Sequence, residues 1–380
     1  ILGTVYTSIS DGSGGYYIGG TFTQVGGVAR ASLVHLLADG SVDPNFNPSS
    51  DGTVYSLVLS GTTLYVGGSF LNIGGQARNR VAAIDTTTGL ATSFNPNADN
   101  FVRTLVLSGT TLYAGGNFAN IGGQVRNKLA AIDTTTGLAT AFNTNISGFL
   151  LIGVNTLALD GTTLYVGGNF TNIGGQARGN VAAVSTATGL ATAFNPNAAG
   201  GFAFGSVDAL LISGTSIYVG GNFSSIGGQG RSCLAEIVIA TGLATAFNPG
   251  PTTNIEPQVK ALALDGTTLY VGGQFTTLGG QARTHVGAVS TATGLATSFN
   301  PKAGKLVNAL SLSGTTLYAG GAFKSLNTQT RNYVASLNIK TGQVTSFNPN
   351  LSPFTTVGSV SKLALSGTTL YVGGYYNNIG

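Results

Sequence analysis

The chain has 380 residues, of which only 7% are charged and 59 are glycine, and its formal net charge is +4. Its glycine and proline content lies below that of disordered low-complexity chains, and 42% of its residues are hydrophobic, enough for a folded core. The sequence has no apolar run near the ~18 residues of a membrane helix, no partner for Cys233 and no basic cluster, which excludes a transmembrane helix, an intrachain disulfide and a nucleic-acid groove.

A Gly-Gly doublet that follows a short apolar stretch recurs along the whole chain at intervals of 48 to 53 residues. A period near 50 is typical of solenoids and propellers. Each complete repeat also has an Asn-Pro pair, with threonine in place of proline in the third repeat, and its second residue always lies 29 residues after the first doublet glycine. The length therefore varies only between this position and the next doublet. One connection in each repeat therefore tolerates insertion. The doublets begin at Gly19, Gly67, Gly115, Gly167, Gly220, Gly272, Gly320 and Gly373.

Each repeat contains four short strand patterns, which the third repeat illustrates in chain order. Residues 102–107 and 111–115 are apolar and are separated by a Ser-Gly-Thr turn, so they predict a first hairpin. A fixed loop with a second glycine pair leads to residues 128–133, and a Thr-Gly turn then leads to residues 138–142. No stretch has a sustained period of 3.6 residues. The sequence therefore predicts an all-β chain, a β-propeller of four-stranded antiparallel blades.

The number of blades follows from counting hairpins. The chain has eight first hairpins but seven second hairpins, because it stops just after the eighth doublet. We expect eight blades, seven complete and an eighth completed by residues outside this sequence. The alternative is seven blades with a displaced hairpin, which would leave sheet edges uncovered. Residues 1–380 are expected to be a single propeller domain, a fragment of a longer chain.

Two stretches resemble known propeller repeats. Leu-Val-Leu-Ser-Gly-Thr-Thr-Leu-Tyr-Ala-Gly-Gly at residues 105–116 resembles kelch-like blades, which place a Gly-Gly doublet after the second strand. Asp-Gly-Ser-Val-Asp-Pro-Asn-Phe-Asn at residues 39–47 is similar to the bacterial delta-sixty type of repeat. The resemblance implies a propeller of the kind common in large extracellular or surface proteins of bacteria. It is weak evidence for function, because propellers carry many unrelated activities.

An arginine stands 11 residues after the first doublet glycine in all seven complete repeats. In the functional interpretation, a ring of guanidinium groups holds carboxylates, phosphates or sulfated sugars. In the structural interpretation, each arginine caps carbonyls of the fixed loop or stacks on the repeat phenylalanine. Repetition favours the structural role, because a packing device is copied with its blade. The arginines are Arg30, Arg78, Arg126, Arg178, Arg231, Arg283 and Arg331.

Four longer connections, at residues 145–153, 197–206, 250–258 and 350–359, break the symmetry of the repeats. If their apolar side chains are exposed together, they form a patch that binds another protein or a second copy of the chain. The alternative is that they fold inward over the channel mouth or fill gaps between blades. The residues of this predicted patch are Phe149, Leu150, Leu151, Ile152, Phe202, Phe204, Ile255, Leu351 and Phe354.

The sequence contains no nucleophile motif, phosphate loop or calcium loop, and His35 and His285 have no neighbouring ligands in the sequence. We predict no catalytic residue, no metal and no cofactor. The expected function is that of a non-enzymatic, secreted bacterial protein at the cell surface or outside the cell, acting in protein binding, adhesion or assembly. A lectin-like propeller that binds glycans, or a glycan-cleaving enzyme with its site on the long-connection face, is the alternative.

Overall fold

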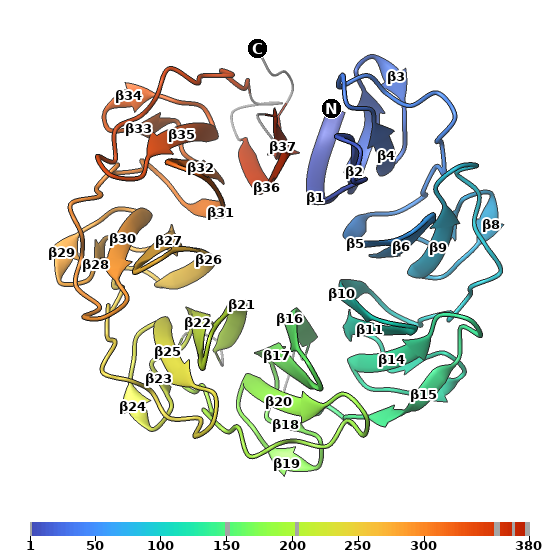
Figure 1. Cartoon of the computed structure of the whole chain (residues 1–380), viewed down its shortest axis with the longest axis horizontal. Coiled ribbons are helices and arrows are strands. Elements are labelled where there is room, and N and C mark those ends of the chain that lie inside the picture. Colours follow the sequence, from blue (N-terminus) through green and yellow to red (C-terminus); the bar gives the residue numbers. More distant parts are fainter. Residues whose placement is uncertain (1, 149–152, 202–204, 353–357, 367–368, 377–380) are drawn as a thin grey trace.

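The computed structural model describes residues 2–148, 153–201, 205–352, 358–366 and 369–376. Its sheets stand as blades in a ring, and the first and last blades lie side by side (Figure 1). Among the described residues, no helix is long and apolar enough to span a membrane. The innermost strands, nearest the axis, are β1 (Leu2–Ser10), β5 (Val54–Ser60), β10 (Val102–Ser108), β16 (Gly153–Asp160), β21 (Ser206–Ser213), β26 (Gln258–Asp265), β31 (Val307–Ser313) and β36 (Ser359–Ser366).

Each innermost strand pairs antiparallel with a second strand, and in the complete repeats the second strand pairs antiparallel with a third. The second strands are β2 (Tyr16–Val25), β6 (Thr63–Gly68), β11 (Thr111–Gly116), β17 (Thr163–Asn169), β22 (Ser216–Asn222), β27 (Thr268–Gln274), β32 (Thr316–Gly321) and β37 (Thr369–Tyr375). The third strands are β4 (Leu33–Leu36), β9 (Val81–Asp85), β14 (Leu129–Asp133), β20 (Val181–Ser185), β25 (Leu234–Val238), β30 (Val286–Ser290) and β35 (Val334–Asn338).

The predicted fourth strand is regular in the third blade, where β15 (Ala139–Asn143) pairs with β14. In the other complete blades it is reduced to a single bridge, such as that between Ile84 and Ala91. The third repeat is also the one that carries Thr144 where the others carry proline. Proline lacks the N–H that a ladder needs, which explains why the other edge strands stay short.

The fixed loop after each second strand is a small hairpin, which the sequence analysis treated only as a loop. In the second blade, Gly74 and Gly75 have φ values of 60° and 75°, as a two-residue type I′ turn requires. In the first blade, β3 (Val28–Ala29) pairs with the end of β2. The other hairpins are β7 (Asn72–Ile73) with β8 (Gln76–Ala77), β12 (Asn120–Ile121) with β13 (Gln124–Val125), β18 (Asn172–Ile173) with β19 (Gln176–Ala177), β23 (Ser225–Ile226) with β24 (Gln229–Gly230), β28 (Thr277–Leu278) with β29 (Gln281–Ala282), and β33 (Ser325–Leu326) with β34 (Gln329–Thr330).

The hydrophobic core lies between neighbouring blades. One cluster unites Tyr65 of the second blade with Val102 and Leu112 of the third. The doublet glycine makes this approach possible, because a Cβ on Gly67 would lie 2.9 Å from Val102 Cγ1. The tyrosine also packs edge-to-face on Phe94, with ring centroids 5.4 Å apart. The Gly-Gly doublet therefore recurs once per blade because each blade contacts the next one at this glycine.

The first and last blades close the ring through the same kind of contact. A Cβ on Gly373 would lie 2.2 Å from Cβ of Val5, and Gly3 forms a bridge with Tyr376. Tyr16 stacks on Tyr371 at a centroid distance of 4.1 Å, and its hydroxyl donates to the carbonyl of Leu365. The expected eight-bladed ring is confirmed, and the alternative of seven blades with a displaced hairpin is wrong.

Candidate functional site

The two faces of the ring differ in what they carry. The strand order places the small hairpins and the connections that enter the innermost strands on one face, which we call the connection face. The tight turns between first and second strands lie on the other, the turn face. Hydrogen bonds hold the connection to the blade that it enters. The carboxylate of Asp51, for example, accepts hydrogen bonds from the backbone N–H groups of Leu71 at 2.8 Å and Asn72 at 3.0 Å.

The repeat arginines make the same backbone contacts in every complete blade. Arg78 donates from Nη1 to the carbonyl of Ala77 at 2.8 Å and from Nη2 to that of Thr92 at 2.6 Å. Arg30, Arg126, Arg178, Arg231, Arg283 and Arg331 each donate to the corresponding pair of carbonyls. These are the bonds that the structural interpretation requires.

The predicted apolar patch is described in part. Phe149, Leu150, Leu151, Ile152, Phe202, Phe204 and Phe354 lie outside the described residues. Ile255 is 73% exposed, as a patch residue must be. Leu351, in contrast, is fully buried in a cluster with Tyr333 and Val360, so its assignment to the patch is wrong. Its position corresponds to Ala98 and Ala198, which are also buried, and this alignment is the signal that sequence reasoning missed.

A β-bulge interrupts every innermost strand close to the connection face. In β5 the pairing with β6 shifts between Val54 and Ser56, which leaves Tyr55 unpaired. A valine precedes the bulged residue in all eight blades. The backbone device is copied, whereas the side chain it presents differs from blade to blade. We call these residues the bulge ring: Tyr6, Tyr55, Arg103, Asn155, Asp208, Lys260, Asn308 and Ser361.

The two aromatic residues of the bulge ring, Tyr6 and Tyr55, lie in the first two blades. Tyr6 and Tyr55 contact edge-to-face, with centroids 5.4 Å apart and planes at 60°. Phe101, just before β10, lies 6.4 Å from Tyr55 at 59° and is 39% exposed. Burial raises the pKa of Tyr6, and the neighbouring Tyr55 raises it further. We call Tyr6, Tyr55 and Phe101 the aromatic arc.

Arg103 is the bulged residue of the third blade. Its side chain is exposed, and its Nε donates to Oδ1 of Asn117 at 2.6 Å. In the part of the chain that the structure describes, Arg103 forms no ion pair with a carboxylate. Two Nη groups therefore remain available for an anion.

Blades four to six carry a polar network around Asp208. Its carboxylate accepts from Asn155 Nδ2 at 3.1 Å, from Gln258 Nε2 at 2.7 Å and from Ser206 Oγ at 3.2 Å. Lys260 Nζ lies 3.6 Å from the same carboxylate. Because its partners come from both neighbouring blades, Asp208 is held in place and its charge is compensated.

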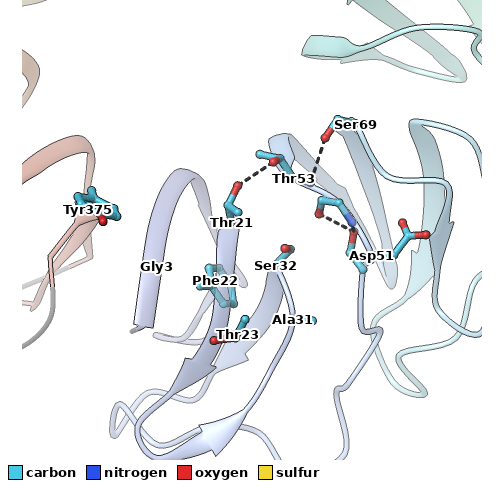
Figure 2. Close-up of a pocket in the computed structure, with 12 residues that line it drawn as sticks. Gly3, Thr21, Phe22, Thr23, Ala31, Ser32, Asp51, Thr53, Ser69 and Tyr375 are labelled. Carbon is cyan, nitrogen blue, oxygen red and sulfur yellow. Dashed lines mark hydrogen bonds between the residues drawn. The ribbon is translucent and has the colours of Figure 1, made fainter. Parts of the chain in front are cut away.

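A cavity of about 570 Å³ lies between the last blade and the first two (Figure 2). Its lining includes the hydroxyl groups of Thr21, Thr53, Ser69 and Tyr375. The hydroxyls of Thr21 and Thr53 are 2.7 Å apart and hydrogen-bonded (Figure 2). Thr53, which lines the cavity, lies two residues before Tyr55 in the sequence.

A second unusual cluster lies on the turn face of the first blade. His35 bonds through Nδ1 to Asp43 at 2.8 Å and through Nε2 to Asp11 at 3.1 Å, two carboxylates that are distant from it in the sequence. Desolvation alone would raise the pKa of both carboxyls, but hydrogen bonds from His35 and neighbouring groups outweigh it and lower both pKa values. Among the described residues, no group of three or more His, Cys, Asp or Glu side chains is arranged to hold a metal.

Comparisons with known proteins agree on the fold. A family model described as "Domain of unknown function (DUF5122) beta-propeller" matches residues 12–46. The structure is similar to the computationally designed Ika8 protein, at 14% identity and a TM-score of 0.61, over 99% of this chain and 97% of Ika8. BamB from Moraxella catarrhalis is similar at 16% identity and a TM-score of 0.53, over 99% and 90% of the two chains. A chain of a mitotic checkpoint complex is similar at 16% identity and a TM-score of 0.50, over 84% and 83%. A search of curated proteins found no match.

Proposed function

We propose that this propeller is a non-catalytic module that binds another protein on its connection face. The observation that carries the proposal is the bulge ring, where one backbone device presents a different side chain in each blade. A feature that only packs the blades repeats in both its backbone and its side chain, as the repeat arginines do. A site that recognises one asymmetric partner needs different groups around the ring.

The non-catalytic part of the proposal is supported by the state of the polar groups at the ring. Asp208 is the carboxylate of the bulge ring, and its oxygens are occupied by Asn155, Gln258, Ser206 and Lys260. A general acid or base must instead reach a substrate proton. Glycan cleavage also needs a second carboxyl group at a set distance from the first, and the other bulge residues carry none.

We further propose that the repeats are of the delta-sixty type and that the protein is bacterial and works at the cell surface or outside the cell. The repeat pattern at residues 39–47 and the low charge content support this placement. Protein binding is in keeping with the presence of the same fold in a mitotic checkpoint complex.

The proposal is tested by blocking one face at a time. Cys233 is 1% exposed, so a maleimide polymer reacts only with an introduced cysteine. Glu256→Cys places the polymer on the connection face, and Thr87→Cys places it on the turn face. A library of random linear peptides is selected on the unmodified protein, and the binding of the selected peptides is measured on both conjugates. We expect loss of binding only with the Glu256→Cys conjugate.

Three outcomes would overturn the proposal. The first is equal binding to both conjugates, and the second is failure of the selection to yield any binder. The third is cleavage of a compound in a panel of bacterial glycans, which would establish the enzymatic alternative.

A further inference from the structure

We propose that the aromatic arc and Arg103 form a pocket for an acidic segment of the partner protein, with an apolar side chain on the arc and a carboxylate on the guanidinium. This inference rests on the proposed function and names the chemistry of its ligand. The pocket comprises Tyr6, Tyr55, Phe101 and Arg103, from the first three blades.

The guanidinium of Arg103 is oriented by a hydrogen bond through its Nε. Asn117 accepts from its Nε at 2.6 Å. Lys128 Nζ donates to the backbone carbonyl of Asn117 at 2.7 Å, and the Asn117 side chain packs close to the next blade, where a Cβ on Gly153 would lie 3.2 Å from its Nδ2. A guanidinium fixed through Nε presents its Nη groups as a planar fork, the geometry that binds a carboxylate through two parallel hydrogen bonds.

The local charge also favours a carboxylate. The bulge ring carries Arg103, Lys260 and Asp208, and the last two lie within ion-pair distance of each other. Asp99, the acidic residue closest to Arg103 in the sequence, accepts hydrogen bonds from the backbone of Ala119 and the side chain of Asn120. Arg103 is therefore the uncompensated charge of the bulge ring.

The shape of the aromatic arc favours a peptide over a sugar. Its neighbouring rings meet at interplanar angles of 60° and 59°, so they do not form a flat platform. A sugar ring stacks on a flat aromatic face and needs polar groups around its hydroxyls, whereas an aromatic side chain can pack edge-to-face against rings that meet at an angle. The arc offers only tyrosine hydroxyls as polar groups.

The spacing of the two parts suggests the sequence of the ligand. Phe101 and Arg103 are two residues apart at the start of β10, a separation of about 6 to 7 Å in extended chain. An extended segment with an apolar residue and an aspartate or glutamate at adjacent or alternate positions would match both parts.

The test compares peptide binding to two variants, each of which lacks one positive charge, either in the pocket or on the turn face. The probes are the peptides selected from the random library on the unmodified protein, and their Kd is measured by calorimetry. Arg103→Gln removes the pocket charge, and Lys340→Gln removes one charge from the turn face as a matched control. We expect the selected peptides to combine an apolar residue with Asp or Glu. We expect Arg103→Gln to weaken binding about tenfold or more and Lys340→Gln less than about twofold.

Two further variants separate the contribution of the aromatic arc to binding from that of the guanidinium. Tyr55→Ala is expected to weaken binding of the apolar residue about tenfold. Arg103→Lys keeps the charge without the fork, so its affinity is expected to lie between those of the unmodified protein and Arg103→Gln. The melting temperatures of the Arg103 variants should stay within about 2 °C of the unmodified protein, because the side chain is exposed.

Selected peptides without acidic residues, or an effect of Arg103→Gln no larger than that of Lys340→Gln, would overturn the pocket. Binding of a neutral glycan that depends on Tyr55 but not on Arg103 would do the same. If the polymer on the Glu256→Cys variant still blocks such peptides, the proposed function stands and only the pocket fails. If it does not block them, both fail.

Discussion

Two positions occur once in every complete blade, the repeat arginine and the bulged residue, and they behave in opposite ways. At the arginine position both the backbone and the side chain repeat, and the guanidinium bonds to carbonyls of its own blade. At the bulge only the backbone repeats, and the side chains form aromatic contacts in one half of the ring and a polar network in the other. In a repeat protein, groups that build the blade are copied, and groups that distinguish one partner are free to vary.

The largest effect is expected from breaking the backbone of the bulge. A Cβ on Gly116 would lie 2.0 Å from the carbonyl oxygen of Phe101, so Gly116→Ala forces the innermost strand to move. We expect a loss of about 3 kcal/mol in the free energy of unfolding, measured by urea denaturation. Gly230→Ala is the matched control, because its Cβ meets nothing within 4 Å, and it should change stability by less than about 0.5 kcal/mol. Equal effects would contradict this role of the doublet.

The next effect separates the arginine position from the bulge. Arg283 donates to the carbonyls of Ala282, Thr297 and Phe299, and it is 8% exposed. Arg283→Met leaves these carbonyls without their donor and should cost about 2 kcal/mol in the free energy of unfolding. Arg103→Met, at the exposed bulge, should cost less than about 0.5 kcal/mol. A larger loss at Arg103 than at Arg283 would reverse the comparison.

A smaller effect concerns the His35 cluster, which is unique to the first blade. The folded-state pKa values of Asp11 and Asp43 are lowered, so the ionised carboxylates stabilise the fold above about pH 4, and this contribution is lost as pH falls through the folded-state pKa values. Asp43→Asn should therefore lower the unfolding free energy at pH 7 by about 1 kcal/mol and by much less at pH 2.5. A difference that is the same at both pH values would show that the charge of Asp43 contributes nothing.

The smallest effect is expected at the polar half of the bulge ring. Asp208→Asn removes the ion pair with Lys260, which is partly exposed, and should cost less than about 1 kcal/mol at low salt. The loss should shrink in 0.5 M salt because salt screens exposed charges. A salt-independent loss would mean that the hydrogen bonds of Asn155 and Gln258, rather than the charge, hold the three blades together.

The fold was predictable because its main constraint is local in the sequence. A glycine doublet marks where a second strand meets the next blade, as Gly67 meets Val102, and its period gives the number of blades. The reduced fourth strand was not predicted, because the effect of proline on the edge depends on pairing across the sheet.

The candidate site was harder to predict because it depends on groups far apart in the chain. The bulge at Tyr55 arises from pairing with β6, and its contact with Tyr6 crosses between blades. A signal was nevertheless present in the sequence. In most repeats the residue 12 positions before the doublet varies, and a valine directly precedes it. Leu351 was misassigned because its connection was considered alone rather than aligned with Ala98 of another repeat. The partners of His35 were missed because Asp11 precedes it by 24 residues and Asp43 follows it by 8.

Crosslink mapping tests the contrast between copied and varied positions most directly. A library-selected peptide that carries a photoreactive phenylalanine is irradiated with the protein, and the attached residues are identified by mass spectrometry. The account predicts attachment on the inner rim of the first three blades, around Tyr6, Tyr55 and Arg103. Attachment at the loops that carry the repeat arginines, or on the turn face, would contradict it.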